Sequence, residues 1–443
     1  MSQARSSLIT PSDRDDGSFA RALTTLVQMV SSVLGSMERV AMISLHTSPL
    51  VQPGSGDSGG MNVYVREVAS ALAQAGVECT TYTRADRPGL PAEVLVEPGH
   101  RVVHVPAGEY DLPKEALADE LDAFTAGVLA HLRDGPGVDV VHGNYWLSGV
   151  VGHRLKHDLD VPLVATFHTL ARVKAEGGDL EPEWRDQAEA EVVGCSDAIC
   201  VSCPEEERQF RRLYGNPAGR IEIVPPAVEH AFFAPGDRTG ARRAIGLPAD
   251  RRVILFVGRV QPLKAPDLAI RALAALARDD AMLVVVGGAS GADGSDYAGR
   301  TRQLVTDLGL DDRVRFVEPQ PHHILSSYYR AADVVVVPSR SESFGLVALE
   351  AAACGIPVVA SAVGGLLNVV HDGVTGHLVD GRDPARFGRA ITHLLDDPVG
   401  AGAMGAAAAV RARRFTWSFT AARLRRLYRD IAGQPVRTLV ACT

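Results

Sequence analysis

The chain has few of the features that mark secreted, membrane and nucleic-acid-binding proteins. Its 443 residues include only six cysteines, most of them in apolar segments, which favours reduced, buried thiols in a cytoplasm over a disulfide framework. No apolar run is long enough to span a bilayer. The net charge of -8 gives no support to a nucleic-acid partner, although an acidic protein can still hold a phosphorylated ligand in a basic pocket. We therefore expect a cytoplasmic protein without a membrane span.

Metal-binding motifs are also scarce. Cys200 and Cys203 form a C-x-x-C, but no second Cys or His pair follows at ligand spacing. A strand with two small buried thiols is the better interpretation. No D-x-D stands in a context where it would hold a metal-bound diphosphate. We expect no bound metal and no required cofactor, with Mg²⁺ left open.

Residues 1–38 differ from the rest of the chain. The stretch "PSDRDDGS" is polar and rich in turn-forming residues, and "FARALTTLVQMVSSVLG" is mildly amphipathic. The leading region is acidic and no convincing cleavage site follows, which is not the pattern of a secretory signal. We expect a flexible extension, or an upstream translation start with Met37 as the true one.

From Arg39 onward, short β-branched runs alternate with helical patterns, and the alternation restarts after a Pro- and Gly-containing break at 225–240. Continuous apolar strands separated by helices predict parallel sheets that are covered on both faces. We predict an α/β protein of two doubly wound, Rossmann-like domains, whose strands point their carboxyl ends at a central cleft. The expected strands are 39–46, 77–83, 101–106, 138–143, 162–168, 198–202 and 221–226, then 251–259, 281–288, 313–319, 332–339 and 356–362; the expected helices include 61–75, 113–134, 183–194 and 417–431.

The stretch "PGSGDSGG" (53–60) places four glycines directly before a predicted helix. Glycine removes Cβ atoms from a contact surface, and a helix N-terminus offers unpaired N–H groups and partial positive charge. This combination suits close approach of the backbone to an anion or a polar sugar. The spacing is neither G-x-G-x-x-G nor a P-loop, and an ordinary turn also uses glycine, so both readings stay open.

Two cations follow the first strand of the second domain, in "FVGRVQPLK" (256–264). Arg259 and Lys264 lie at a strand exit that faces the expected cleft, where they suit a diphosphate. Ordinary surface charge on a solvated loop is the alternative.

Two carboxylates stand eight residues apart in "PSRSESFGLVALEAAACG" (338–355). The stretch "SFG" opens a helix between Glu342 and Glu350, and because eight residues on a helix make slightly more than two turns, both carboxylates can face one side. The surrounding helix is otherwise apolar, so Glu350 needs a polar partner, and a sugar diol is suitable.

Together these motifs resemble glycosyltransferase family 4, the retaining enzymes of GT-B fold. The resemblance covers roughly 39–433, and its most specific part is the E-x7-E of 342–350 with "FVGR" and Lys264 upstream. Within the family, "RVAMISLHTSPLVQPGSGDSGGMNVYVREVASAL" (39–72) is similar to the actinobacterial branch that glycosylates D-inositol 3-phosphate in mycothiol biosynthesis. These features imply a small-molecule nucleotide sugar and a small-molecule acceptor as partners.

The resemblance implies a role for each matching residue. Arg259 and Lys264 would bind the donor diphosphate, Glu350 the ribose and Glu342 the hexose, while His168 would lie by the reacting centre. Lys114, Tyr145, Thr169 and Arg185 would form a cage for the acceptor phosphate. The implied catalytic residues are His168, Glu342, Arg259 and Lys264; the donor site is Gln52, Pro53, Gly60, Arg259, Lys264, Glu342 and Glu350; and the acceptor site is His46, Asp57, Ser58, Gly59, Gly60, Met61, Asn62, Lys114, Tyr145, Thr169 and Arg185.

The implied reaction is retaining transfer of N-acetylglucosamine from UDP-N-acetylglucosamine to 1D-myo-inositol 3-phosphate. A different acceptor or sugar in secondary metabolism is a first alternative, because relatives usually read "SHYWLSG" where this chain reads "GNYWLSG", and 170–185 diverges. A non-catalytic sugar-nucleotide or inositol-phosphate binding protein is a second, and a homodimer is left open. The expected parts are a flexible extension (1–38), an acceptor domain (39–228), a nucleotide-sugar domain (229–415), a helix packing back on the first domain (416–434) and a tail (435–443).

Overall fold

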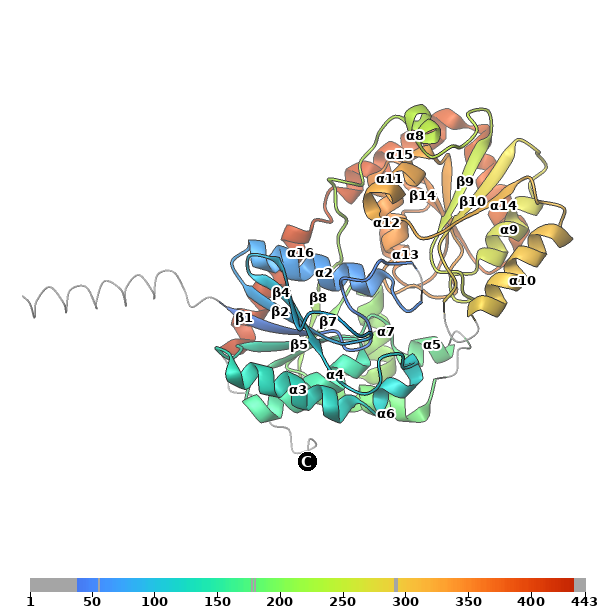
Figure 1. The fold of residues 1–443 in the computed structure, drawn as a ribbon. Coiled ribbons are helices and arrows are strands. Elements are labelled where there is room, and N and C mark those ends of the chain that lie inside the picture. The colour runs from blue at the N-terminus through green and yellow to red at the C-terminus, as the bar shows by residue number, and fades with distance from the viewer. Residues whose placement is uncertain (1–37, 55, 177, 179–180, 291–293, 434–443) are drawn as a thin grey trace, which may run out of the picture. The chain divides into compact units, whose positions relative to one another are not determined.

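The computed structural model describes residues 38–433, except residues 55, 177, 179–180 and 291–293. The expected extension (1–38) and tail (435–443) therefore lie almost wholly outside the described residues. Within the described part, two separate sheets confirm the predicted α/β class (Figure 1). We call the part that carries the first sheet the N-terminal lobe and the part that carries the second the C-terminal lobe.

The N-terminal lobe is built on an eight-stranded sheet with the order β3-β4-β2-β1-β5-β6-β7-β8. Seven of these strands are parallel, as predicted, but the edge strand β3 runs antiparallel to β4. The prediction missed β3 because it alternates exposed and half-buried residues and has no continuous apolar run. The strands are β1 Arg39–Ile43, β2 Glu78–Arg84, β3 Glu93–Glu97, β4 His100–Val105, β5 Val140–Asn144, β6 Leu163–Thr166, β7 Ala198–Val201 and β8 Arg220–Ile223.

Both faces of this sheet are buried, which is why its strands read as continuous apolar runs. In β1, Ala41 and Ile43 belong to one core cluster while Val40 and Met42 belong to another on the opposite face. The first face packs against α3, α4, α6 and α7, and the second against α2 and the C-terminal helix α16. The helices are α2 Gly60–Gln74, η1 Lys114–Ala118, α3 Leu121–Asp134, α4 Trp146–Leu159, α5 Ala171–Glu176, α6 Glu183–Cys195, α7 Pro204–Tyr214 and α16 Trp417–Ala432; the single helix predicted at 113–134 is thus a 3₁₀ turn followed by α3.

The C-terminal lobe repeats this plan with a six-stranded, fully parallel sheet in the order β11-β10-β9-β12-β13-β14. Its two faces form separate cores, one with α8, α11, α12 and α15 and the other with α9, α10 and α14. The strands are β9 Arg252–Val257, β10 Ala281–Val286, β11 Val314–Val317, β12 Val334–Val337, β13 Val358–Ser361 and β14 Gly376–Val379, and the helices are α8 Arg238–Ala244, α9 Pro266–Ala274, α10 Gly294–Asp307, α11 His322–Ala331, α12 Leu346–Ala353, α13 Leu366–Val369, α14 Pro384–Asp396 and α15 Pro398–Ala412.

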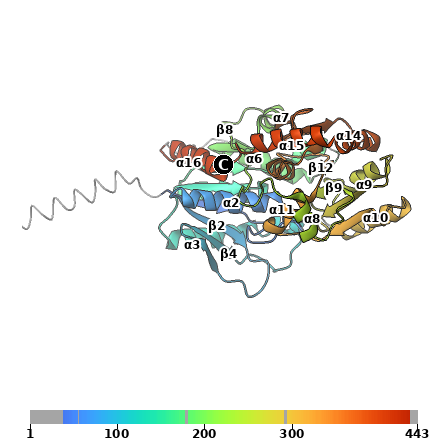
Figure 2. The same cartoon turned by 90° about the horizontal axis from the view of Figure 1, so that it is seen from above.

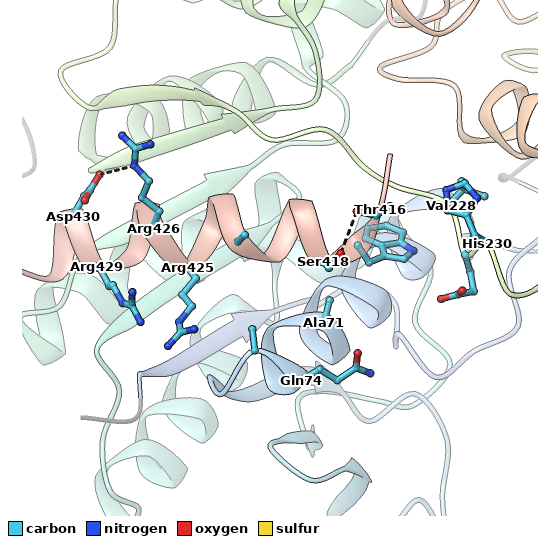
Figure 3. A pocket seen from close by; sticks show the side chains of 14 residues that line it. Ala71, Gln74, Val228, His230, Thr416, Ser418, Arg425, Arg426, Arg429 and Asp430 are labelled. Atoms are coloured by element: carbon cyan, nitrogen blue, oxygen red, sulfur yellow. Dashed lines mark hydrogen bonds and ion pairs between the residues drawn. The ribbon is translucent and has the colours of Figure 1, made fainter. Parts of the chain in front are cut away.

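Helix α16 lies against the N-terminal lobe, beside α2 (Figures 1 and 2). Its apolar residues Trp417, Leu424 and Ile431 pack on β1, β5 and α2, and the Tyr428 hydroxyl lies 2.6 Å from Nδ1 of buried His142. A groove of about 850 Å³ runs between α16 and α2 (Figure 3). None of the residues predicted for the donor or acceptor site lines this groove, so its size does not mark it as that site.

The cysteines follow the sequence prediction in part. Cys79, Cys200, Cys203 and Cys354 are buried free thiols, whereas Cys195 is disulfide-bonded. Cys442 lies outside the described residues. In the described part of the chain, no helix combines the length and the hydropathy needed to cross a bilayer.

Candidate active site

The glycine loop connects β1 to α2, as predicted, and its shape is fixed by one buried amide. Asn62, only 1% exposed, accepts a hydrogen bond from Gly59 N–H at 3.0 Å. Its Nδ2 donates to Thr47 Oγ1 and Ser48 O, both at 2.7 Å. Both ends of the Asn62 side chain thus hold the loop, and this contact was not anticipated from the sequence.

The loop also touches the C-terminal lobe along its backbone. Gly288 N–H donates to Gly54 O at 2.9 Å, and Gly56 N–H donates to Ala289 O at 3.2 Å. A Cβ on Gly59 would lie 3.3 Å from Nε of Arg259. The backbone of this glycine-rich stretch therefore passes directly against the C-terminal lobe and the side chain of Arg259, where larger side chains would have little room.

The other residues predicted in this loop contact one lobe or the other. Gln52 Nε2 donates to Gln320 O of the C-terminal lobe at 3.0 Å, beside Pro53. Ser58 is buried and its hydroxyl lies 3.2 Å from Thr47 Oγ1. Asp57 is exposed, and Met61 packs against the N-terminal core.

Arg259 and Lys264 both follow β9, as the sequence predicts. Burial lowers the pKa of Arg259, while the charges of Asp57 and Glu342 act in the opposite direction. Lys264 Nζ donates to Glu342 Oε2 at 2.6 Å, in a pair whose side chains are 22% and 16% exposed. These two cations and Glu342 therefore share one site at the strand exit.

A helix opens between the two acidic residues of the E-x7-E motif, as predicted, but Glu342 precedes it, so the argument from helical spacing does not hold for this residue. Helix α12 begins at Leu346 after Gly345, whose φ of 103° is a conformation that favours glycine. Glu342 therefore lies in the preceding loop. Its carbonyl oxygen would lie 2.0 Å from a Cβ on Gly364, which has a φ of 48°, so the second glycine loop packs directly on the loop that carries Glu342.

Glu350 lies on α12 and is 8% exposed. Burial raises its pKa from the ordinary 4.5 to about 7, although the Tyr329 hydroxyl opposes this shift by donating a 2.6 Å hydrogen bond to Glu350 Oε2. The sequence predicted that this glutamate needs a polar partner, and Tyr329 is one. A single hydroxyl leaves the other carboxylate oxygen without a protein donor among the hydrogen bonds of the described residues.

His168 follows β6 and has a left-handed φ of 60°, which is uncommon for a residue other than glycine. Ser343 of the C-terminal lobe donates to its carbonyl oxygen at 2.6 Å. Its Nε2 lies 3.1 Å from Asn144 Oδ1, and since an amide oxygen only accepts, Nε2 carries the hydrogen. Burial lowers the pKa of His168 to about 3, so the imidazole is neutral.

The four residues predicted to cage a phosphate come together around the ring of Tyr145. Lys114 Nζ lies 4.9 Å and the Arg185 guanidinium 5.3 Å from the ring centroid. Arg185 Nη2 donates to Thr169 O at 3.2 Å and to Thr169 Oγ1 at 3.3 Å. The ring of His46 lies 4.4 Å from that of Tyr145. The sequence placed these residues on separate connections, and the fold brings them to one point.

Electrostatics support this grouping. Burial lowers the pKa of His46, and the charges of Lys114, Arg259 and Arg185 lower it further. The cations Lys114 and Arg185 of the acceptor cage and Arg259 of the diphosphate site therefore all act on one imidazole. Such a concentration of positive charge at the carboxyl ends of two parallel sheets is suited to two anionic ligands.

Comparisons with known proteins agree with this geometry. Residues 59–227 match the Glycosyl transferase 4-like domain, and residues 237–411 match Glycosyl transferases group 1. The chain belongs to this glycosyltransferase family. It is 49% identical over 409 residues to a D-inositol 3-phosphate glycosyltransferase from Acidothermus cellulolyticus, covering 89% of this chain and 91% of the relative.

Two further similarities bear on the acceptor and on the fold. A D-inositol 3-phosphate glycosyltransferase from Mycobacterium bovis is 47% identical over 405 residues, covering 89% of this chain and 84% of the relative. Among solved structures, a sucrose-phosphate synthase from Thermosynechococcus elongatus is 35% identical, with a TM-score of 0.84 over 89% of this chain and 98% of that chain. The predicted GT-B fold is confirmed, and the protein is a glycosyltransferase.

Four residues of this site were not found by sequence reasoning: Asn144, Tyr329, Ser343 and Glu189. Each acts on a predicted residue through a hydrogen bond or ion pair. None of the four stands in a motif that would mark it. The one available signal was the buried Glu350, whose need for a polar partner is met by Tyr329.

Proposed function

We propose that this glycosyltransferase transfers N-acetylglucosamine from UDP-N-acetylglucosamine to 1D-myo-inositol 3-phosphate, with retention of the anomeric configuration. The observation that carries the proposal is the convergence of Lys114, Thr169 and Arg185 around Tyr145. Relatives named for this acceptor, at 46–49% identity over most of the chain, support it.

The acceptor phosphate would lie over the Tyr145 ring, where Lys114 and the Thr169 hydroxyl offer donors. Charge-assisted contacts of this kind are the strongest hydrogen bonds available to a protein. His46 lies against the same ring, and the charges of Lys114, Arg185 and Arg259 all lower its pKa. A hydroxyl of the bound cyclitol would therefore face the donor sugar.

The donor would bind to the C-terminal lobe, with its diphosphate at Arg259 and Lys264 and its ribose at Glu350. As the glycosidic bond breaks, negative charge builds on the leaving diphosphate, and the two cations would stabilise that charge. The leaving oxygen would take the proton of the attacking hydroxyl on the same face of the sugar. Neutral His168, with its Nε2 hydrogen directed to Asn144, would position the sugar rather than supply a charge.

Metal independence belongs to the proposal, because Arg259 and Lys264 already supply two positive charges for the diphosphate. Within the described residues, His153, His157 and Cys195 have ligand atoms within 4.8 Å of one another, but Cys195 is disulfide-bonded. Transfer at an undiminished rate in the presence of EDTA is the expected result.

A matrix of donors and acceptors tests the proposal. UDP- and ADP-linked sugars are combined with inositol 3-phosphate, inositol and fructose 6-phosphate, and the products are identified by mass spectrometry. The expected pair gives N-acetylglucosaminyl-inositol phosphate, with NMR of the product reporting the anomeric configuration. An inverted product, or equal rates with inositol and inositol 3-phosphate, would contradict the proposal.

A phosphorylated hexose is the second candidate acceptor, because of the 35% identity with a sucrose-phosphate synthase. Its phosphate would use the same cage. Product formation with fructose 6-phosphate but not with inositol 3-phosphate would select this candidate. Binding of both substrates without release of nucleotide would instead favour a non-catalytic role.

A further inference from the structure

A carboxylate, that of Glu181, lies against the cations of the acceptor cage. Glu181 lies between α5 and α6, and its Oε2 is 2.9 Å from Nη1 of Arg185. Its other oxygen, Oε1, pairs with Nζ of Lys174. The Glu181 side chain is 17% exposed, whereas Arg185 is only 2% exposed. Glu181 is thus the more accessible member of the pair and covers the guanidinium.

The nitrogens of Arg185 are all engaged within the protein. Nε donates to Glu189 Oε1 at 2.9 Å, Nη1 faces Glu181, and Nη2 donates to Thr169. Because every nitrogen has a partner and the side chain is almost fully covered, a phosphate can reach this guanidinium only where a partner moves away. The partners differ in how firmly they are held.

Glu189 is fixed in place. It is fully buried, and besides Arg185 it accepts hydrogen bonds from Ala171 N–H at 2.9 Å and from the Tyr214 hydroxyl. These contacts tie together α5, α6 and α7. Glu181 instead lies in a connection, and the partners that it has among the described residues are the side chains of Lys174 and Arg185. Glu181 is therefore the partner that an incoming anion can replace.

The charges favour this exchange. Glu181 places a negative charge against both Arg185 and Lys174. When this carboxylate moves away, the positive charge that the two side chains offer to a phosphate dianion increases. A phosphate that bound while Glu181 remained would meet a like charge at short range, which is costly at a partly buried site.

We propose that Glu181 competes with the acceptor's phosphate for Arg185 and Lys174, so that a phosphorylated acceptor binds by displacing this carboxylate. The inference rests on the proposed function and deepens it, because it makes Glu181 a determinant of acceptor specificity. An acceptor without a phosphate leaves the ion pairs intact and gains nothing from Arg185. A dianion replaces Glu181 and makes two charge-assisted contacts in its stead.

The test compares Glu181→Gln with wild type, because glutamine keeps the shape and removes the charge. The acceptor's KM for inositol 3-phosphate is expected to fall by about three- to thirtyfold, with the donor's KM unchanged. Glu176→Gln is the matched control, because Glu176 is the last residue of α5 and pairs with Arg212 in an exposed ion pair. Both KM values of this variant should equal those of wild type. An unchanged or raised acceptor KM in a folded Glu181→Gln protein would overturn the proposal.

A direct binding measurement keeps the two proposals separable. Inorganic phosphate, titrated by calorimetry into each protein, should bind Glu181→Gln about three- to thirtyfold more tightly than wild type. Glu181→Ala is expected to behave alike and serves if the glutamine variant melts early. Tighter phosphate binding without any transfer to inositol 3-phosphate would retain the displacement and reject the acceptor. Equal phosphate affinity in all proteins would reject the displacement whatever the acceptor is.

Discussion

Donor binding should release a proton from Glu350. Burial raises the pKa of this carboxyl to about 7, so at neutral pH it is protonated in part of the molecules. Ribose hydroxyls that donate to the carboxylate favour the charged form and return the pKa toward its ordinary value. The affinity for UDP-N-acetylglucosamine should therefore rise with pH and be about tenfold higher at pH 8 than at pH 6. The rise should be about fivefold between pH 6 and pH 7 and about twofold between pH 7 and pH 8.

Calorimetry measures this directly. UDP-N-acetylglucosamine is titrated at pH 6, 7 and 8 in buffers of different ionisation enthalpy, which counts released protons. Release should be about 0.9 proton at pH 6 and about 0.5 at pH 7. The diphosphate of an intact nucleotide sugar is a diester and does not titrate in this range. Glu350→Gln keeps the shape of the side chain and should bind with no such dependence, so a pH-independent wild type, or an equal dependence in the variant, refutes the reasoning.

The same shift predicts a change in stability. Because the folded-state pKa of Glu350 is raised above the ordinary 4.5, the folded protein binds more protons than the unfolded chain between about pH 4.5 and pH 7. The contribution of Glu350 to the free energy of unfolding is therefore most favourable below this window and falls as the pH rises through it. Urea unfolding at pH 5 and pH 7 should show a smaller decrease in Glu350→Gln than in wild type.

Four further substitutions test the remaining assignments. Lys114→Ala should raise the acceptor's KM about ten- to hundredfold through loss of one charge-assisted contact and leave the donor's KM nearly unchanged. Steady-state kinetics that show an equal rise in both KM values would contradict the assignment of Lys114 to the acceptor cage. Glu342→Ala and Lys264→Ala should each abolish measurable turnover, with circular dichroism showing that the fold is intact. Near-wild-type rates in either variant would mean that these two side chains, which pair at 2.6 Å, do not belong to the donor site. Asn144→Ala should lower kcat about tenfold or more by freeing the His168 ring with little change in either KM, whereas an unaltered kcat would show that the 3.1 Å contact has no part in catalysis.

The strands were predictable because most of them are buried on both faces. A run such as "VVVV" in β12 has no polar face, and only a parallel sheet between helix layers buries it completely. β3 and β14 were not predicted, because neither is a continuous buried apolar run. β3 is a partly exposed edge strand, and β14 begins with Gly376 and contains half-buried residues. Edge strands bury one face or less, so their sequences carry a weaker signal.

The site was predictable only where a local motif defines it. Arg259 and Lys264 follow a strand directly, so the strand's position determines theirs. The position of Glu342 was mistaken because eight-residue spacing assumes a continuous helix, whereas Gly345 delays the start of α12 until Leu346. The acceptor cage came from the family resemblance alone, since the spacing of Lys114, Tyr145, Thr169 and Arg185 in the sequence carries no sign that they meet.

The charges of the candidate site connect the mildly acidic composition with the two anionic substrates that we propose. Lys264 is paired with Glu342, Arg185 with Glu181 and Glu189, and Asp57 acts on Arg259. A site whose cations are already matched by carboxylates needs no large surplus of positive charge, so a protein with a net charge of -8 could hold the two phosphate sites that we propose. An incoming phosphate must then exceed an existing carboxylate in charge and in number of hydrogen bonds. A dianion meets both conditions and a neutral hydroxyl meets neither, so the selectivity for phosphorylated substrates that we propose would follow from the paired state of the cations themselves.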